Sequence, residues 1–136
     1  MDAEDAVEAE AFAVLNVKDV TAKAKVFQHV PQDEPLKNPG DAVIVIGDMN
    51  SESIPTKDAS DEQGELVIFA MVVAEERKAL RLLKGLIKPR LDKHRADRGG
   101  WRIEFTFKDA EGFLEPETGK VYIGNFRFNW FAFAAS

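Results

Sequence analysis

The chain has 136 residues and a mass of 15.2 kDa, enough for one domain with a moderate hydrophobic core. It contains no cysteine, which excludes disulfides, zinc–thiolate sites and thiol catalysis. Its net charge of −6 argues against general nucleic-acid affinity. The charge is uneven, because acids dominate residues 1–20 whereas residues 77–102 hold ten Lys or Arg. This asymmetry suits a subunit that meets copies of itself.

The N-terminus is acidic, whereas a signal peptide begins with a basic segment and an apolar run. No segment approaches the roughly 18 consecutive apolar residues of a membrane span. We therefore expect a soluble protein that is not exported by a signal peptide and has no membrane partner.

The first predicted element is a helix over residues 2–17. An apolar stripe at helical spacing defines one face, with Val7, Ala11, Val14 and Leu15. Acids are frequent in the first turns, and Asp2 or Asp5 can cap the helix.

Three strands are predicted next, over residues 26–31, 42–47 and 65–74. The second and third are apolar on both faces, so we expect both faces to be covered. Residues 32–41 form a loop with two prolines and a glycine. Residues 48–64 are polar and could hold a bulged strand end near 51–54. A mobile loop within 50–64 could reach a neighbouring molecule.

A second helix is predicted over residues 75–95, where Pro89 should kink or shorten it. Residues 101–107 alternate strictly between apolar and polar side chains, which indicates a half-buried antiparallel strand. After an irregular segment at 108–114 and a turn at Glu115–Gly119, residues 120–134 return as a long strand. The order is α-β-β-β-α-β-β, a single α+β domain of antiparallel sheet packed with two helices.

Residues 26–48, VFQHVPQDEPLKNPGDAVIVIGD, contain a strand broken by proline, a polar loop and an apolar strand ending in Gly-Asp. This order of motifs resembles that of the tail-completion (tail terminator) proteins of long-tailed phages, tailocins and gene transfer agents. In those proteins an HVPQ-like segment is followed by a strand that ends in VIG(D/E). The polar loop 56–64, the basic helix and the C-terminal hairpin follow the same order as in that family. Two features depart from it: the loop 32–41 lacks an aromatic residue, and the N-terminal helix is unusually acidic.

The resemblance implies one tail-terminator-like domain over residues 1–136, a structural protein and not an enzyme. Such proteins form a ring, commonly a hexamer, that caps the major tail tube protein, stops tube growth and joins the tube to the head-side connector. DNA would pass through the lumen without specific binding, in a particle assembled in the bacterial cytoplasm. The alternatives are a head–tail connector or neck protein and, in another class, a small-molecule binding module with a concave apolar pocket.

No catalytic, cofactor-binding or metal-ligating residues are predicted. The two histidines lack the paired spacing of a zinc site; we expect His29 to be packed or hydrogen-bonded and His94 to be solvated. Asp48, Asn50 and Glu52 imitate the start of a calcium loop, but the required glycine and the final glutamate are missing. The chain also has no phosphate-binding glycine loop and no GxSxG motif.

The main candidate interface is a basic stripe on the second predicted helix, formed by Arg77, Arg81, Lys84 and Lys88. It can face acidic residues of a neighbouring subunit, line the lumen near DNA, or remain a solvated helix face. DNA contact is the least favoured, because a passage for DNA should avoid strong phosphate binding.

Two further groups are candidates for the subunit or tube interface. The first comprises charged residues of the predicted mobile loop: Lys57, Asp58, Asp61 and Glu62. The second comprises Phe131 and Phe133, which fall on the face of the last strand opposite Trp130. These two rings are either core residues or residues buried only on assembly.

Overall fold

The computed structural model describes residues 1–31, 36–53 and 61–134. The predicted α+β class is confirmed, with one short helix and one short strand more than expected. The elements in chain order are α1 (Ala3–Leu15), α2 (Lys18–Thr21), β1 (Lys25–Phe27), β2 (Ala42–Ser53), β3 (Glu62–Val73), α3 (Lys78–Leu91), β4 (Arg95–Arg98), β5 (Trp101–Leu114) and β6 (Val121–Ala134).

The strands form one sheet in the order β1-β2-β3-β6-β5-β4. Every neighbouring pair is antiparallel except β1 and β2, which run parallel. The prediction of a wholly antiparallel sheet is therefore wrong at one edge. The physical reason is the connection of residues 28–41, which is long enough to return the chain to its starting direction, as a parallel pair requires.

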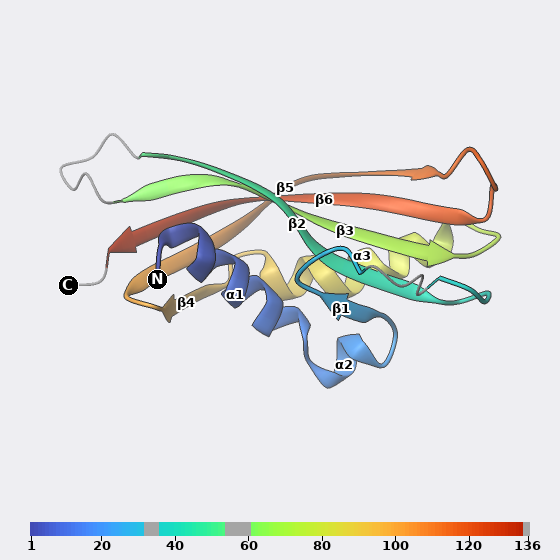
Figure 1. Cartoon of the computed structure of the whole chain (residues 1–136), viewed down its shortest axis with the longest axis horizontal. Helices are drawn as coiled ribbons and strands as arrows, with labels where there is room; N and C mark the ends of the chain where they lie inside the picture. Colours follow the sequence, from blue (N-terminus) through green and yellow to red (C-terminus); the bar gives the residue numbers. More distant parts are fainter. Residues whose placement is uncertain (32–35, 54–60, 135–136) are drawn as a thin grey trace.

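The two longer helices, α1 and α3, pack on the same face of the strongly twisted sheet (Figure 1). Only alternate residues of the central strands join the core cluster with them, as Leu66 and Ile68 do in β3 and Phe128 and Trp130 do in β6. The molecule is thus a two-layer α+β domain, with one face of the sheet carrying no helix. Among the described helices, none has the length and apolar character needed to cross a membrane.

Helix α1 begins where the sequence predicts. The Asp2 side chain accepts a hydrogen bond from the backbone N–H of Asp5 at 2.8 Å, so Asp2 is the cap. Small buried residues such as Ala3 and Ala6 allow the helix to approach the strands closely.

The second predicted helix is shorter than expected. Helix α3 ends at Leu91, soon after Pro89, and the residues that follow form strand β4. Lys93 adopts a left-handed φ of 66° and donates its N–H to the Phe105 carbonyl, which turns the chain back onto the sheet.

Two segments predicted as mostly irregular are long strands, of which only a bulged strand end near 51–54 was anticipated. Strand β2 continues to Ser53 and β3 begins at Glu62, so much of the expected loop 50–64 is a paired hairpin arm. Strand β5 runs through 108–114 with a register shift after Phe107. Bulges of this kind hide strands from a period-two pattern, because one extra residue inverts the alternation. The far halves of β2 and β5 lie at opposite ends of the long axis (Figure 1).

Candidate subunit interface

The basic stripe lies along one flank of α3, beside its buried apolar face. The apolar face of the helix is fully packed, with Leu80, Leu83, Ile87 and Leu91 buried. Arg77 and Arg81 are exposed, whereas Lys84 and Lys88 are half-buried. This division follows from the 3.6-residue period, which places the four basic residues on one flank of the helix.

The two lysines pack over an aromatic ring of the neighbouring strand. Their Nζ atoms lie 5.7 Å (Lys84) and 4.5 Å (Lys88) from the centroid of Phe107 in β5. Both distances suit a cation–π interaction, so part of the stripe is held in place by the domain itself.

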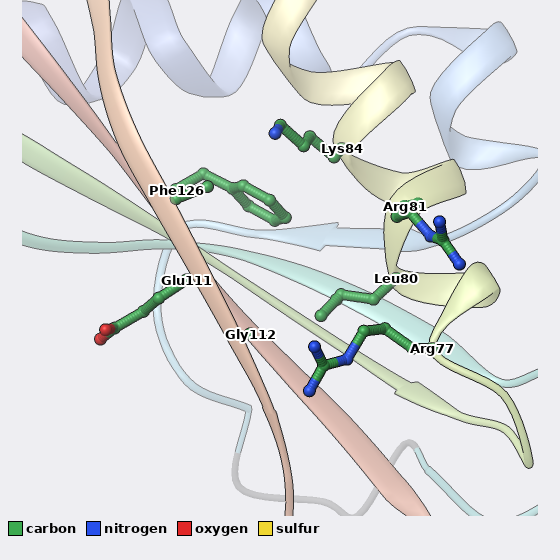
Figure 2. Close-up of a pocket in the computed structure, with 8 residues that line it drawn as sticks. Arg77, Leu80, Arg81, Lys84, Glu111, Gly112 and Phe126 are labelled. Atoms are coloured by element: carbon green, nitrogen blue, oxygen red, sulfur yellow. The ribbon is translucent and has the colours of Figure 1, made fainter.

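A hollow of about 140 Å³ separates α3 from β5 and β6. Three cations line its helix side, Arg77, Arg81 and Lys84 (Figure 2). Within the described residues, no ion pair joins any of the three. The hollow is therefore positively charged and open to an anionic group.

The acids of β5 do not neutralise this hollow. The Glu111 side chain points away from α3 (Figure 2) and accepts a hydrogen bond from Arg127 at 2.9 Å. Asp109 accepts from the same guanidinium at 2.9 Å, and hydrogen bonds to both carboxylates raise the pKa of Arg127 above its ordinary value.

The four charged residues of the predicted loop that were candidates for the interface do not lie in one environment. Lys57 and Asp58 lie outside the described residues. Asp61 is buried, with 8% of its surface exposed, and accepts a hydrogen bond from the backbone N–H of Ala134 at 3.1 Å, which ties β3 to the end of β6. Glu62 is half-buried and opens β3.

Phe131 and Phe133 lie on the sheet face that carries no helix. They are half-buried, stand outside the core cluster and stack on each other with centroids 6.4 Å apart. The interpretation as core residues is therefore wrong, because both helices cover the other face. Phe131 lines a polar hollow with residues of β2 and β3, including Asn50 and Gln63.

A charged cluster that the sequence did not predict joins α1 to β4. Glu10 is buried, and its carboxylate bonds to His94 Nε2 at 2.7 Å and to Arg98 Nε at 2.9 Å. Burial opposes ionisation of Glu10, but the hydrogen bonds and charges of His94 and Arg98 outweigh it and lower its pKa.

The histidine expectations are both reversed. His94, expected to be solvated, is half-buried because it lies just before β4 and contacts Glu10 of α1. His29, expected to be packed or hydrogen-bonded, has a side chain that is 85% exposed. One signal was present in the sequence: Glu10 follows Ala6 and Val7 at helical spacing, so a carboxylate on the apolar face required a buried partner.

A second hollow, an apolar groove of about 510 Å³, runs between α3 and the start of β2. Its lining is aliphatic, as at Val72, Leu83 and Leu86, and Lys23 is the one charged residue among the described lining residues. A small-molecule site needs several convergent polar groups, and this groove does not supply them.

The sequence that imitates a calcium loop is part of strand β2, where an extended backbone cannot wrap around an ion. In the described ranges no group of three or more His, Cys, Asp or Glu is arranged to hold a metal.

These features define a two-layer α+β domain with a basic hollow at one end. Neither a protein-family model nor a curated protein sequence matches the chain. A chain in a solved structure described as "Virion of native gene transfer agent (GTA) particle" has a similar fold, with a TM-score of 0.80 and 16% sequence identity. The match covers 95% of this chain and 96% of that chain, so the two folds correspond over nearly their whole length.

Proposed function

We propose that this chain is a structural subunit of a phage-like particle, and more specifically a tail terminator. The observation that carries the proposal is the near-complete match in fold to a chain of a gene transfer agent virion. The HVPQ and VIGD segments, which resemble the tail-completion family, support the finer assignment. In this role the protein acts by assembly and not by catalysis.

Copies of the chain would form a ring, commonly a hexamer, on the finished end of the tail tube. The ring would stop tube growth and present a surface to the head-side connector, with DNA passing through its lumen. The basic stripe on α3 is the surface we assign to contacts between subunits, because its cations lack ion-pair partners within the described residues. A neck protein of the same particle is the alternative, and binding to tube protein separates the two.

The proposal is tested by native mass spectrometry and negative-stain imaging over a range of concentrations, with and without the tail tube protein encoded nearby. Closed rings, or monomers that become rings when tube protein is added, are expected. A protein that stays monomeric at every concentration, with or without tube protein, would contradict the proposal. Rings that bind connector protein but not tube protein would favour the neck assignment.

The role of the stripe is tested by reversing two of its charges. The double variant Arg81→Glu/Lys84→Glu should weaken assembly at least about tenfold, because like charges brought together across an interface are strongly unfavourable. The control Lys18→Glu/Lys93→Glu makes the same change in net charge at two exposed positions elsewhere. Equal assembly of the two variants would show that the stripe is not part of the interface. Circular dichroism checks that both variants remain folded.

A further inference from the structure

The sheet has two strand edges that its own strands leave open. Strand β1 pairs with β2 only over residues 43–45, and β4 pairs with β5 only over residues 101–104. Beyond these partners, residues 49–53 (the β2 arm) and residues 109–114 (the β5 arm) are each paired on one side only within the described chain. Such edges present unpaired N–H and C=O groups that accept another strand.

A bulge stands at the base of each arm. The register shifts between Ile46 and Met49 in β2 and between Phe107 and Asp109 in β5. Bulges bend a strand and increase its twist, so each arm departs from the direction set by its short outer strand. The arms lie at opposite ends of the molecule's long axis (Figure 1).

The β2 arm and the hollow beside the β5 arm carry opposite charges. Near the β2 arm, Asp48, Glu52 and Glu62 take part in no ion pair within the described residues. On the β5 arm, the acids Asp109 and Glu111 are already paired with Arg127. Between this arm and α3 lies the positive hollow described above, whose lining includes residues 110–112.

We propose that the β2 arm of one copy adds as a strand to the β5 arm of the next copy, with Glu62, which lies opposite Ala132 on the helix-bearing face of the sheet, directed toward the basic hollow beside α3. This inference rests on the proposed function and names the contact by which the ring closes. Both arms are short extended segments, so backbone hydrogen bonds supply the pairing and the charges supply its register. A contact between two different surfaces of the same chain is head-to-tail and closes into a ring when its rotation permits.

The absence of native cysteine makes cross-linking a direct test. Ser51→Cys on the β2 arm is combined with Ala110→Cys on the β5 arm, and the assembled protein is treated with a flexible bis-maleimide, so that the register need not be known. We expect covalent dimers and higher multimers from the double variant and no multimers from either single variant. The control pairs Ser51→Cys with Ala13→Cys, an exposed position on α1.

Proline gives a second, independent readout. Backbone N–H groups of consecutive strand residues point to opposite sides, so Ser51→Pro and Glu52→Pro differ in which edge they disrupt. One variant should lose monomer stability by breaking its pairing with β3. The other should keep the unfolding midpoint of the wild type and yet assemble at least about tenfold less well, because it blocks only the outer edge.

Charge exchange completes the test. Asp48→Lys/Glu62→Lys should assemble poorly alone, and should regain assembly when mixed with Arg81→Glu/Lys84→Glu. Rings that form without cross-links between the arms, tolerate the outer-edge proline and show no rescue would overturn the strand addition but leave the proposed function intact. A wild-type protein that never assembles, even with tube protein, would overturn both.

Discussion

At the scale of single residues, the buried Glu10 carboxylate links two elements through hydrogen bonds to charged partners. It joins α1 to β4 through His94 and Arg98. We expect Glu10→Gln to lower the free energy of unfolding by about 1.5–3 kcal/mol at pH 7, the usual contribution of hydrogen bonds to charged groups. Urea denaturation followed by tryptophan fluorescence measures this change.

The pH dependence of stability follows from the lowered pKa of Glu10. Because the folded pKa of Glu10 lies below its ordinary value of 4.5, its stabilisation is present above that pH and is lost as the pH falls through the folded value. The wild type should therefore lose more stability than Glu10→Gln as the pH is lowered from neutral into this range. The control Glu8→Gln, in a half-buried residue 4.0 Å from exposed His29, should change stability by less than about 0.5 kcal/mol. Parallel pH profiles for the wild type and Glu10→Gln would contradict this role.

Alanine substitution at two glycines, Gly64 and Gly85, should change the stability of the protein in opposite directions. A Cβ at Gly64 would overlap the Asn50 carbonyl oxygen across the β2–β3 arm, whereas a Cβ at Gly85 on the exposed side of α3 meets open space. Gly64→Ala should destabilise the protein by about 1–3 kcal/mol or more. Gly85→Ala should stabilise it by about 0.5–1 kcal/mol, because glycine weakens a helix interior. Thermal unfolding of both variants checks the signs, and a neutral Gly64→Ala would mean that the arm is not closely packed there.

At the scale of elements, the structure shows which of two candidate residues, Asp2 or Asp5, caps the N-terminus of α1. The Asp2 carboxylate accepts the Asp5 N–H, whereas Asp5 lies within the first turn. Asp2→Ala should therefore cost about 0.5–2 kcal/mol, and Asp5→Ala should cost less, since it removes only a favourable charge near the helix dipole. Chemical denaturation of the two variants side by side measures the difference, and a larger loss for Asp5→Ala would reverse the assignment.

The elements that the sequence predicted well are those with an unbroken period. The apolar face of α3 and the alternation of residues 101–107 each extend over several repeats, so the helix and the first half of β5 were located closely. The second halves of β2 and β5 were missed because bulges interrupt their alternation and polar residues fill both faces. Strand β4 was absorbed into the predicted helix, since a four-residue strand has no period of its own.

The positions of the candidate interface residues on α3 were predicted for the same reason, while their role as an interface stays a prediction. The basic stripe depends only on helical spacing, and the structure places its four residues on one flank of α3. The pairing of Glu10 with His94 and Arg98 joins residues more than 80 positions apart, and a single sequence gives no measure of such contacts. The burial of Asp61 was missed because its partner is a backbone N–H of the last strand.

At the scale of the whole molecule, the sheet carries an acidic strand arm at one end and a basic hollow toward the other. The open β2 arm and the open β5 arm lie at opposite ends of the long axis (Figure 1), and within the described residues neither the acids near the β2 arm nor the cations of the hollow beside the β5 arm take part in an ion pair. Contact between the β2 arm and the hollow would bring unlike charges together, whereas contact between two β2 arms would bring acids together. The charge distribution therefore supports the proposed head-to-tail contact independently of the strand geometry.

The proposed contact between charged groups predicts that assembly is sensitive to salt. The charges concerned are exposed or half-buried, and the screening length falls from about 10 Å in 0.1 M salt to about 3 Å in 1 M salt. We expect the wild-type ring to dissociate progressively over this range of sodium chloride in analytical ultracentrifugation, while the unfolding midpoint of the monomer changes little. The variant Arg81→Glu/Lys84→Glu, which assembles poorly at low salt, should recover part of its assembly as salt screens the repulsion. Ring formation by the wild type that is unchanged across this range would show that apolar contacts hold the ring, and would direct attention to the stacked rings of Phe131 and Phe133 on the helix-free face.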